Sequence, residues 1–350
     1  MSSRRVKNTL TKTQKRKKEH LEICLDTESV SSSFGTGLEA YRFIHNALPE
    51  LDIDEIDLSA TFLGKPLGAP IFISSMTGGF DLARKVNRNL AAAAQALGLA
   101  MGVGSQRVAI EEPSAANSFQ VRDLAPDILL FGNLGAVQLN YGYTVEHCRR
   151  AVAMIGADGL IFHLNVLQEA VQPEGNRNFK GLVGKIAAVC RELEVPVVAK
   201  EVGNGISVNV AVRLQRAGVK AIDVAGRGGT SWSAVEAQRA AQQGKPVDRT
   251  FADWGIPTEE ALVRVRQALP DIPLIASGGI RTGLDVAKSI ALGADIAALG
   301  QPLLAAALES PDKVVEFLAG VIHDLKVTML CVGAENLAAL RQVPLVHNVA

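Results

Sequence analysis

Hydrophobic residues occur in short runs that alternate with amphipathic segments from residue 70 onward. The runs are rich in Ala, Val, Ile, Leu and Gly, which is typical of parallel strands buried on both faces. Intervening segments such as 81–98 and 207–218 carry apolar residues at helical spacing and end in Leu-Gly or Ala-Gly, a helix stop signal. Eight runs are found, at 71–76, 100–104, 128–134, 159–165, 195–202, 221–226, 272–279 and 296–300.

This alternation predicts the fold class. Strand–helix repeats form right-handed parallel units, and eight of them predict a (β/α)₈ TIM barrel in residues 70–350. An open doubly wound sheet is the alternative. Residues 1–69 are predicted to form an N-terminal extension, with a short strand or hairpin at 54–70 before the barrel. Two strand–helix connections, about 166–180 and 227–257, are long and follow strand ends, where barrel active sites form.

Charge is concentrated at the N-terminus. The first twenty residues carry eight Lys or Arg and one Glu, and we expect them to be mobile when nothing is bound. The stretch "KTQKRKKEH", residues 12–20, resembles a nuclear or nucleic-acid signal. The whole chain, however, has 36 basic and 36 acidic residues, which argues against a nucleic-acid partner. A plain solvated tail is a third interpretation.

Cysteine use and hydropathy indicate the compartment. Cys24, Cys148, Cys190 and Cys331 are scattered without a CxxC pair, so a disulfide framework or zinc site has little support. No apolar run resembles a signal peptide or reaches membrane-spanning length. We therefore expect a cytoplasmic protein with no membrane partner.

Polar or glycine-rich residues follow all eight predicted strands, and the ends of parallel strands share one face of a barrel. Each residue alone could cap a helix or sit in a turn, but the joint pattern favours a ligand site at that face. The residues at the first five ends are Ser74, Ser75, Met76 and Thr77; Ser105, Gln106 and Arg107; Asn133; His163, Asn165, Gln168 and Glu169; and Lys200.

The last three strand ends predict a phosphate site. "GGTS" follows strand six, "SGGIRTG" strand seven and "LGQP" strand eight. Glycines let backbone N–H groups approach phosphate oxygens, and a following helix N-terminus adds favourable partial charge. The pattern suits the single phosphate of flavin mononucleotide (FMN). Lys200 would then point at the flavin ring and stabilise negative charge near N1, unless it only pairs with Glu201 or Asp223.

These motifs, in this order, resemble the type 2 isopentenyl-diphosphate isomerase family. The matching pieces are "RKKEH", "SSMTGG", "GSQR", "GNLGA", "HLN…QE", "AKEVGNGIS", "GGTSW", "SGGIRTG" and "LGQP", from about residue 16 to the end. The resemblance implies an FMN barrel that interconverts isopentenyl diphosphate and dimethylallyl diphosphate. It also implies Mg²⁺, reduced flavin commonly supplied by NADPH, and a homotetramer or homo-octamer.

The resemblance also implies roles for residues. Gln168 would be the catalytic residue beside the allylic carbons, and Glu169 would bind Mg²⁺. The diphosphate substrate would contact Arg16, Lys17, His20, Ser105, Gln106, Arg107, His163, Asn165 and Gln168. FMN would contact Ser74, Ser75, Met76, Thr77, Ser105, Asn133, Lys200, Thr230, Gly279, Ile280, Arg281, Gly300 and Gln301.

Residue chemistry bears on the mechanism that this family implies. No Cys stands at a strand end, and Glu169 is assigned to the metal, so the hypothesis is that reduced flavin supplies the proton chemistry. Gln168 would orient the alkene, because an amide does not titrate. Arg16, Lys17 and His20 would fold over the barrel mouth as a lid. The alternative function is an FMN-dependent oxidoreductase of the 2-hydroxy-acid oxidase type, although no His stands at the ends of runs five to eight.

Overall fold

Eight parallel strands close into a barrel in the computed structural model, which describes residues 11–26 and 30–348. The order around the ring follows the chain, and β11 pairs with β4 to close it. The (β/α)₈ prediction is therefore confirmed, and the open sheet is wrong. Each predicted run contains one strand: β4 (Ile71–Ile73), β5 (Ala100–Gly102), β6 (Leu130–Gly135), β7 (Gly159–Leu164), β8 (Val197–Glu201), β9 (Ala221–Asp223), β10 (Leu274–Ala276) and β11 (Ile296–Leu299).

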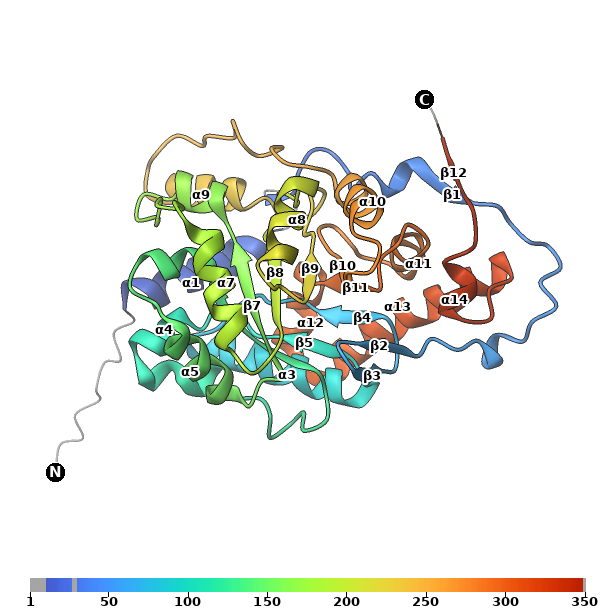
Figure 1. Ribbon diagram of the computed structural model, residues 1–350, viewed down its shortest axis with the longest axis horizontal. Coiled ribbons are helices and arrows are strands. Elements are labelled where there is room, and N and C mark those ends of the chain that lie inside the picture. The colour runs from blue at the N-terminus through green and yellow to red at the C-terminus, as the bar shows by residue number, and fades with distance from the viewer. Residues whose placement is uncertain (1–10, 27–29, 349–350) are drawn as a thin grey trace.

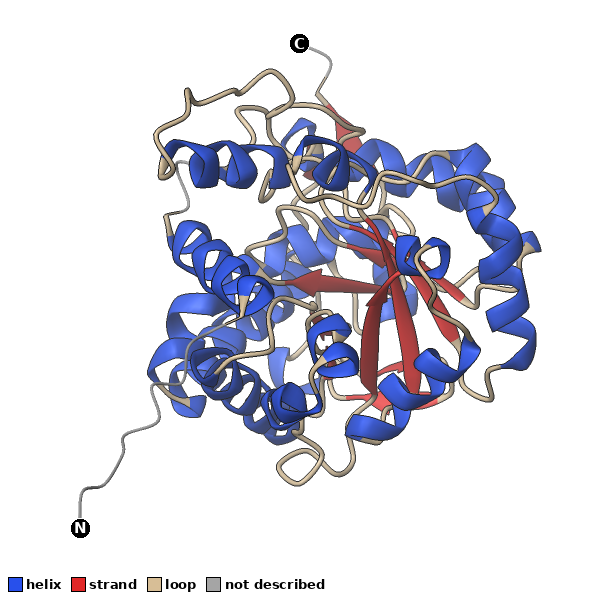
Figure 2. Ribbon diagram, turned by 90° about the vertical axis from the view of Figure 1, so that its left-hand side faces the viewer, coloured by secondary structure: helices blue, strands red, loops and turns tan. Residues whose placement is uncertain are grey.

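Helices surround the strands on the outside (Figure 1, Figure 2). Their ends follow local signals: Gly98 ends one helix in the left-handed conformation, and Thr282 begins another with a capping box. The helices of the outer layer are α3 (Asp81–Leu97), α4 (Arg107–Glu111), α5 (Val145–Ile155), α7 (Leu182–Glu192), α8 (Val208–Arg216), α10 (Thr258–Ala268), α11 (Gly283–Ala291), α12 (Leu304–Glu309) and α13 (Pro311–Val332). None of the helices described is both long and apolar enough to cross a membrane.

The two connections predicted to be long loops each contain a helix, which corrects the expectation from length alone. The first contains α6 (Val166–Val171) and the second contains α9 (Trp232–Ala241). Ser231 caps α9 by accepting a hydrogen bond from the N–H of Ala234, and the helix buries one side against the barrel mouth. Both helices therefore lie at the carboxyl ends of the strands and contribute to the site.

The N-terminal basic stretch also forms a helix, α1 (Lys12–Leu25). The first ten residues lie outside the described part, but from Thr11 onward the expectation of a mobile segment is wrong. Thr11 and Gln14 form a capping box, and Leu21, Ile23 and Cys24 are buried. Apolar residues at the end of the charged run hold the helix against the barrel.

The predicted hairpin before the barrel is present as β2 (Ala60–Phe62) and β3 (Lys65–Leu67). Phe62 and Leu67 pack on the side chains inside the barrel, including Phe72 and Phe131, so the hairpin closes its amino-terminal end. The remaining elements lie outside the barrel: β1 (Tyr41–Phe43) pairs with β12 (Leu345–His347), and α14 (Leu337–Leu340) precedes β12. Short 3₁₀ turns occur at Leu38–Ala40, Ile53–Glu55, Pro113–Ser118, Ala136–Asn140 and Gln301–Leu303.

Two arginine–aspartate pairs hold the amino-terminal ends of strands half a barrel apart. Arg122 donates to Asp158 and to the carbonyls of Gly156, Ala125 and Ile128, beside β6 and β7. Arg266 donates to Asp295 and to the carbonyls of Gly293 and Ile272, beside β10 and β11.

Each aspartate also accepts from the first strand N–H, that of Leu130 or Leu274. The segments "VRDLAPDILL" and "VRQALPDIPL" carry the same Arg, Pro, Asp and Ile at the same spacing. The two halves of the barrel therefore share a repeated structural unit.

We predict that Arg266→Ala destabilises the protein by about 3 kcal/mol, because buried carbonyls and Asp295 lose a charged donor. Chemical denaturation of purified protein measures this. Arg264→Ala on the same helix is the matched control, since Arg264 is exposed and pairs only with Glu260 on its own helix. That control should stay within about 0.5 kcal/mol of the original protein. Equal losses in both variants would contradict the structural role of Arg266.

Candidate active site

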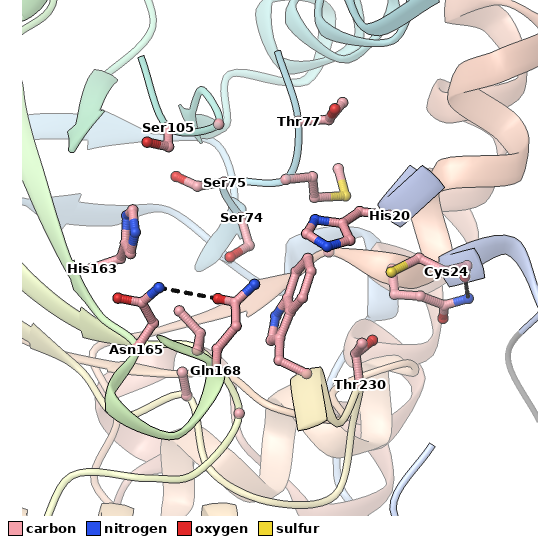
Figure 3. A pocket seen from close by; sticks show the side chains of 18 of the residues that line it. His20, Cys24, Ser74, Ser75, Thr77, Ser105, His163, Asn165, Gln168 and Thr230 are labelled. Atoms are coloured by element: carbon pink, nitrogen blue, oxygen red, sulfur yellow. Dashed lines mark hydrogen bonds between the residues drawn. The ribbon is translucent and has the colours of Figure 1, made fainter. Parts of the chain in front are cut away.

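One cavity opens at the carboxyl ends of the barrel strands and is covered by α1 (Figure 3). Residues after every barrel strand were predicted there, Thr230 after β9 among them, and the loop after β9 contributes Ala225 and Gly229 as well. Of the predicted site residues, those that line it are Arg16, Lys17, His20, Ser74, Ser75, Met76, Thr77, Ser105, Arg107, Asn133, His163, Asn165, Gln168, Glu169, Lys200, Thr230, Gly279, Ile280, Arg281, Gly300 and Gln301.

Gln106 is the exception. Its side chain is fully buried and points away from the cavity, where its amide donates to the carbonyl of Ala151. Its amide oxygen accepts from the backbone N–H of Asn133. Gln106 therefore fixes the backbone beneath Asn133, and a direct contact with substrate is not compatible with this position.

Glycine backbones form one end of the cavity. Gly278 and Gly279 have φ values of 97° and 83°, which side chains rarely adopt. A Cβ atom on Gly229 would lie 2.6 Å from the backbone nitrogen of Gly279, so the loops after β9 and β10 meet only because both lack side chains. Arg281 stands beside them and donates to the carbonyl of Gly279. These backbones and this guanidinium fit the phosphate of FMN.

The wall next to this end is polar and buried. Ser74, Asn133 and Lys200 are buried, and among the described residues the buried Oγ of Ser75 has no hydrogen-bond partner. Such an orphaned hydroxyl fits a polar ring edge that would complete its hydrogen bonding. Lys200 donates to the carbonyl of Glu201 at 2.7 Å, and its Nζ lies 3.9 Å from Asp223 Oδ2. Lys200 thus lies near the Asp223 carboxylate, as the simpler interpretation of this residue expected, and it also lines the cavity.

His163 is held as a neutral imidazole. Its Nδ1 lies 2.8 Å from Asn133 Oδ1. Burial, with the neighbouring charges of Lys200 and Lys17, lowers the pKa of His163 to about 3. An anion bound beside it would favour its protonated form, so the charge state of His163 depends on what occupies the cavity.

Cations gather at the opposite end, beneath α1. Lys17 donates to the carbonyl of Ser105 at 2.7 Å, while Arg107 donates to Glu111 and to Asn176 Oδ1. Burial, with the charges of Arg16 and Arg107, lowers the pKa of Lys17 to about 7. Partly buried cations that repel one another fit a site that is completed by a bound polyanion.

Three residues form an oxygen-rich wall between the two ends: Asn165, which lies between β7 and α6, and Gln168 and Glu169 of α6. The Asn165 amide donates to Gln168 Oε1 at 3.1 Å (Figure 3). It also donates to Glu169 Oε1 at 3.1 Å. Glu169 Oε2 accepts from the N–H of Asn176. Within the described residues, Asn165 Oδ1 is buried without a partner, and no cluster of three or more His, Cys, Asp or Glu side chains could hold a metal by itself. The oxygens of Asn165 and Glu169 fit a hard cation that takes its other ligands from substrate and water.

Sequence reasoning missed several residues around α1. His20 Nε2 lies 2.9 Å from Glu236 Oε1 on α9, and the Trp232 ring meets the His20 ring edge-on. With its amide oriented to satisfy both groups, Gln172 donates to Glu236 and accepts from Arg16. Cys24 lines the cavity, but burial raises the pKa of its thiol to about 12, so it is protonated at neutral pH. The helical spacing of Trp232 and Glu236 was a signal that could have identified α9.

Comparisons with known proteins agree with this geometry. The profile of the FMN-dependent dehydrogenase family matches residues 166–347, just over half of the chain. An isopentenyl-diphosphate delta-isomerase of Nostoc is 55% identical over 94% of each chain, and one of Xanthobacter autotrophicus is 52% identical over 95% of this chain and 97% of its own.

Among solved structures, a mandelate oxidase variant shares the fold with a TM-score of 0.66 and 19% identity, over 96% of this chain and 99% of that chain. A lactate oxidase of Pediococcus acidilactici has a TM-score of 0.62 and 17% identity, covering 95% of this chain and 94% of its own. The oxidases therefore share the barrel architecture, whereas sequence similarity extends along nearly the whole chain to the isomerases. The chain belongs to the FMN-dependent, type 2 isopentenyl-diphosphate delta-isomerase family.

Proposed function

We propose that this protein interconverts isopentenyl diphosphate and dimethylallyl diphosphate, using reduced FMN and Mg²⁺. The observation that carries the proposal is one cavity with two separate anion-binding ends, glycine-rich at Gly278 and Gly279 and cationic beneath α1. A flavin phosphate suits the first end and a substrate diphosphate the second. The proposal extends to NADPH as the reductant and to a homotetramer or homo-octamer in the cytoplasm.

Substrate binding would use the cationic end. Arg16, Lys17 and Arg107 line this end and would pair with diphosphate oxygens, because Arg and Lys form short charge-assisted hydrogen bonds with such groups. His20 and His163 lie on the same cavity. Gln168, which is held by Asn165, would orient the hydrocarbon tail between the diphosphate and the flavin ring. Ser105 also lines the cavity and would offer its hydroxyl.

Glu169 and Asn165 would hold Mg²⁺ together with diphosphate oxygens. Mg²⁺ prefers oxygen ligands and keeps several waters, so one carboxylate and one amide oxygen suffice from the protein. The hydrogen bonds from Asn165 and from the Asn176 N–H hold the Glu169 carboxylate in one orientation. The metal would neutralise charge at the diphosphate and fix its direction.

The isomerisation removes a proton from C2 and adds one at C4. Reduced FMN, when bound, would supply the proton donor and acceptor. Lys200 would hold a positive charge beside the flavin ring, and Asn133 and Ser75 would hydrogen-bond the ring edge. The Gln168 amide does not titrate at physiological pH, so its role is positioning of the alkene.

The family match to FMN-dependent dehydrogenases favours a second candidate, oxidation of a 2-hydroxy acid. That chemistry needs a base to take the hydroxyl or carbon proton. Among the described residues that line the cavity from β8 onward, none is a histidine. The cationic end also suits a diphosphate better than a single carboxylate.

Anaerobic incubation of the purified protein with isopentenyl diphosphate, FMN, Mg²⁺ and NADPH tests the function. Dimethylallyl diphosphate is the expected product, with no net consumption of NADPH after flavin reduction. Oxidation of a 2-hydroxy acid without isomerase product would establish the second candidate instead.

Replacing Glu169 by Gln should lower isomerase activity about 100-fold, because the amide lacks the charge that Mg²⁺ requires. FMN content, measured from flavin absorbance, should not change. Glu194→Gln is the control, since this exposed carboxylate lies outside the cavity. Loss of flavin in the Glu169 variant would mean that the residue serves the flavin rather than the metal.

Lys17 should take up a proton when a polyanion binds. Its pKa of about 7 in the free protein makes it largely neutral at pH 8, and a bound diphosphate favours the charged form. Calorimetric titration with inorganic pyrophosphate at pH 8, in buffers of different ionisation enthalpy, should give about one more proton taken up than in Lys17→Met.

The pyrophosphate affinity of the original protein should also weaken as pH rises above about 7, by up to about tenfold per pH unit. Lys18→Met is the control, because Lys18 is exposed on the other side of α1. Equal proton uptake in the original protein and in Lys17→Met would show that Lys17 is already charged.

A further inference from the structure

An ion-pair network lies behind the cationic end of the cavity, centred on Arg239 of α9. Arg239 does not line the cavity, and only 12% of its side chain is exposed. Its Nε lies 2.9 Å from Glu19 Oε2, its Nη2 2.7 Å from Glu174 Oε1, and its Nη1 3.3 Å from Glu236 Oε2. Each guanidinium nitrogen therefore has a different carboxylate.

The three carboxylates come from three different elements. Glu19 belongs to α1, Glu174 to the loop after α6, and Glu236 to α9 itself. These elements form one side of the cavity mouth. A guanidinium presents its donors in a rigid planar fork, so it can hold three partners in fixed relative positions.

The carboxylates also face the cavity cations. Glu174 Oε1 lies 3.9 Å from Arg16 Nη1, and Glu236 Oε1 lies 2.9 Å from His20 Nε2. Gln172 joins Glu236 to Arg16 through its amide. Arg16 and His20, which line the cavity, are thus oriented by two carboxylates that Arg239 holds from behind.

Charge balance gives Arg239 a second effect. Burial disfavours ionisation of Glu174 and Glu236, but the cations beside them outweigh burial and lower the pKa of both carboxyls. Without Arg239, the described partners left to the two ionised carboxylates would be Arg16, His20 and the amide of Gln172. The carboxylates would then neutralise the charge of Arg16 before any anion arrived, and they would repel that anion.

We infer that Arg239 is a positioning residue for the substrate: it fastens α1 over the cavity mouth and compensates Glu174 and Glu236, so that Arg16 and His20 remain available to a diphosphate. The identity of the anion rests on the proposed function. The fastening of α1 does not, because it concerns contacts within the chain.

Arg239→Gln tests the inference in the FMN-loaded protein. Titration calorimetry with inorganic pyrophosphate should show binding at least about tenfold weaker than in the original protein, as expected when a buried charge network loses its central cation. In the isomerase assay the KM should rise by a similar factor, while kcat changes less than threefold. Arg239→Lys should bind pyrophosphate almost as weakly as Arg239→Gln, because one ammonium cannot reach three separate carboxylates.

A double variant separates compensation of charge from simple structural support. Combining Arg239→Gln with Glu174→Gln removes the carboxylate that would otherwise neutralise Arg16, so pyrophosphate affinity should recover by about threefold or more over the single variant. A merely structural role predicts that the second substitution adds to the damage. No recovery would overturn the charge-compensation part of the inference.

Hydrogen exchange measures the fastening of α1 without any substrate. Glu19→Gln removes only the tie between α1 and Arg239, and the amides of α1 should exchange faster while those of β10 do not. Glu22→Gln on the same helix is the matched control, because Glu22 is exposed and, among the described residues, its ion pair is with Lys18. Equal exchange of the α1 amides in both variants would overturn the fastening role of Arg239. This exchange can be measured even if Arg239→Gln fails to fold, because neither variant changes Arg239.

Failure of this inference is distinguishable from failure of the proposed function. If the original protein binds pyrophosphate but does not produce dimethylallyl diphosphate, the function is wrong and the exchange result still stands. If the isomerase reaction proceeds and Arg239→Gln keeps its pyrophosphate affinity within twofold, the function stands and the role of Arg239 is wrong.

Discussion

Closure of the parallel ring is the constraint on which the rest of this structure depends. The N–H of Ser74, just after β4, donates to the carbonyl of Leu299 at the end of β11 at 2.8 Å. This bond brings residues more than 200 positions apart to the same point on the rim. Because the strands are parallel, every strand end reaches that rim, and polar residues there can line one cavity. The other end of the ring is closed by Phe62 and Leu67 and held by Arg122 and Arg266, so it serves stability.

The site is organised by charge in layers. Arg16, Lys17 and Arg107 line the cavity itself, together with the Glu169 carboxylate. Behind Arg16 stand Glu174 and Glu236, and behind those stands Arg239. Alternation of sign keeps each buried charge beside a partner, while the innermost cations remain available for an anion. The flavin end needs no such arrangement, since backbone N–H groups of glycine loops offer positive partial charge without a counter-charge.

Much of the fold and of the cavity lining followed from local signals. Buried runs, helix stops and glycine pairs have short-range causes, and seven of the eight strands lie within their predicted runs, while β6 extends one residue beyond its run, to Gly135. The repeat "VRDLAPDILL" and "VRQALPDIPL" was also visible in the sequence, yet its meaning depends on Asp158 and Asp295, which lie about 30 residues further on. The family resemblance assigned Gln106 to substrate together with Ser105 and Arg107. Its side chain turns inward instead, because the backbone N–H of Asn133 and the carbonyl of Ala151 need partners there.

By itself, the sequence determined the barrel, the order of its strands and the polar residues at their ends, because periodicity and strand-end chemistry are local properties of the chain. Tertiary structure decided what those residues face. The basic stretch is a helix with its apolar end buried, and Arg16 and His20 are oriented by carboxylates of α9 and of the loop after α6, far away in the chain. Such ion pairs depend on which surfaces meet when the barrel closes, and no spacing along the chain encodes them. The same dependence explains why the role of Arg239, which does not line the cavity, could be identified only in the folded protein.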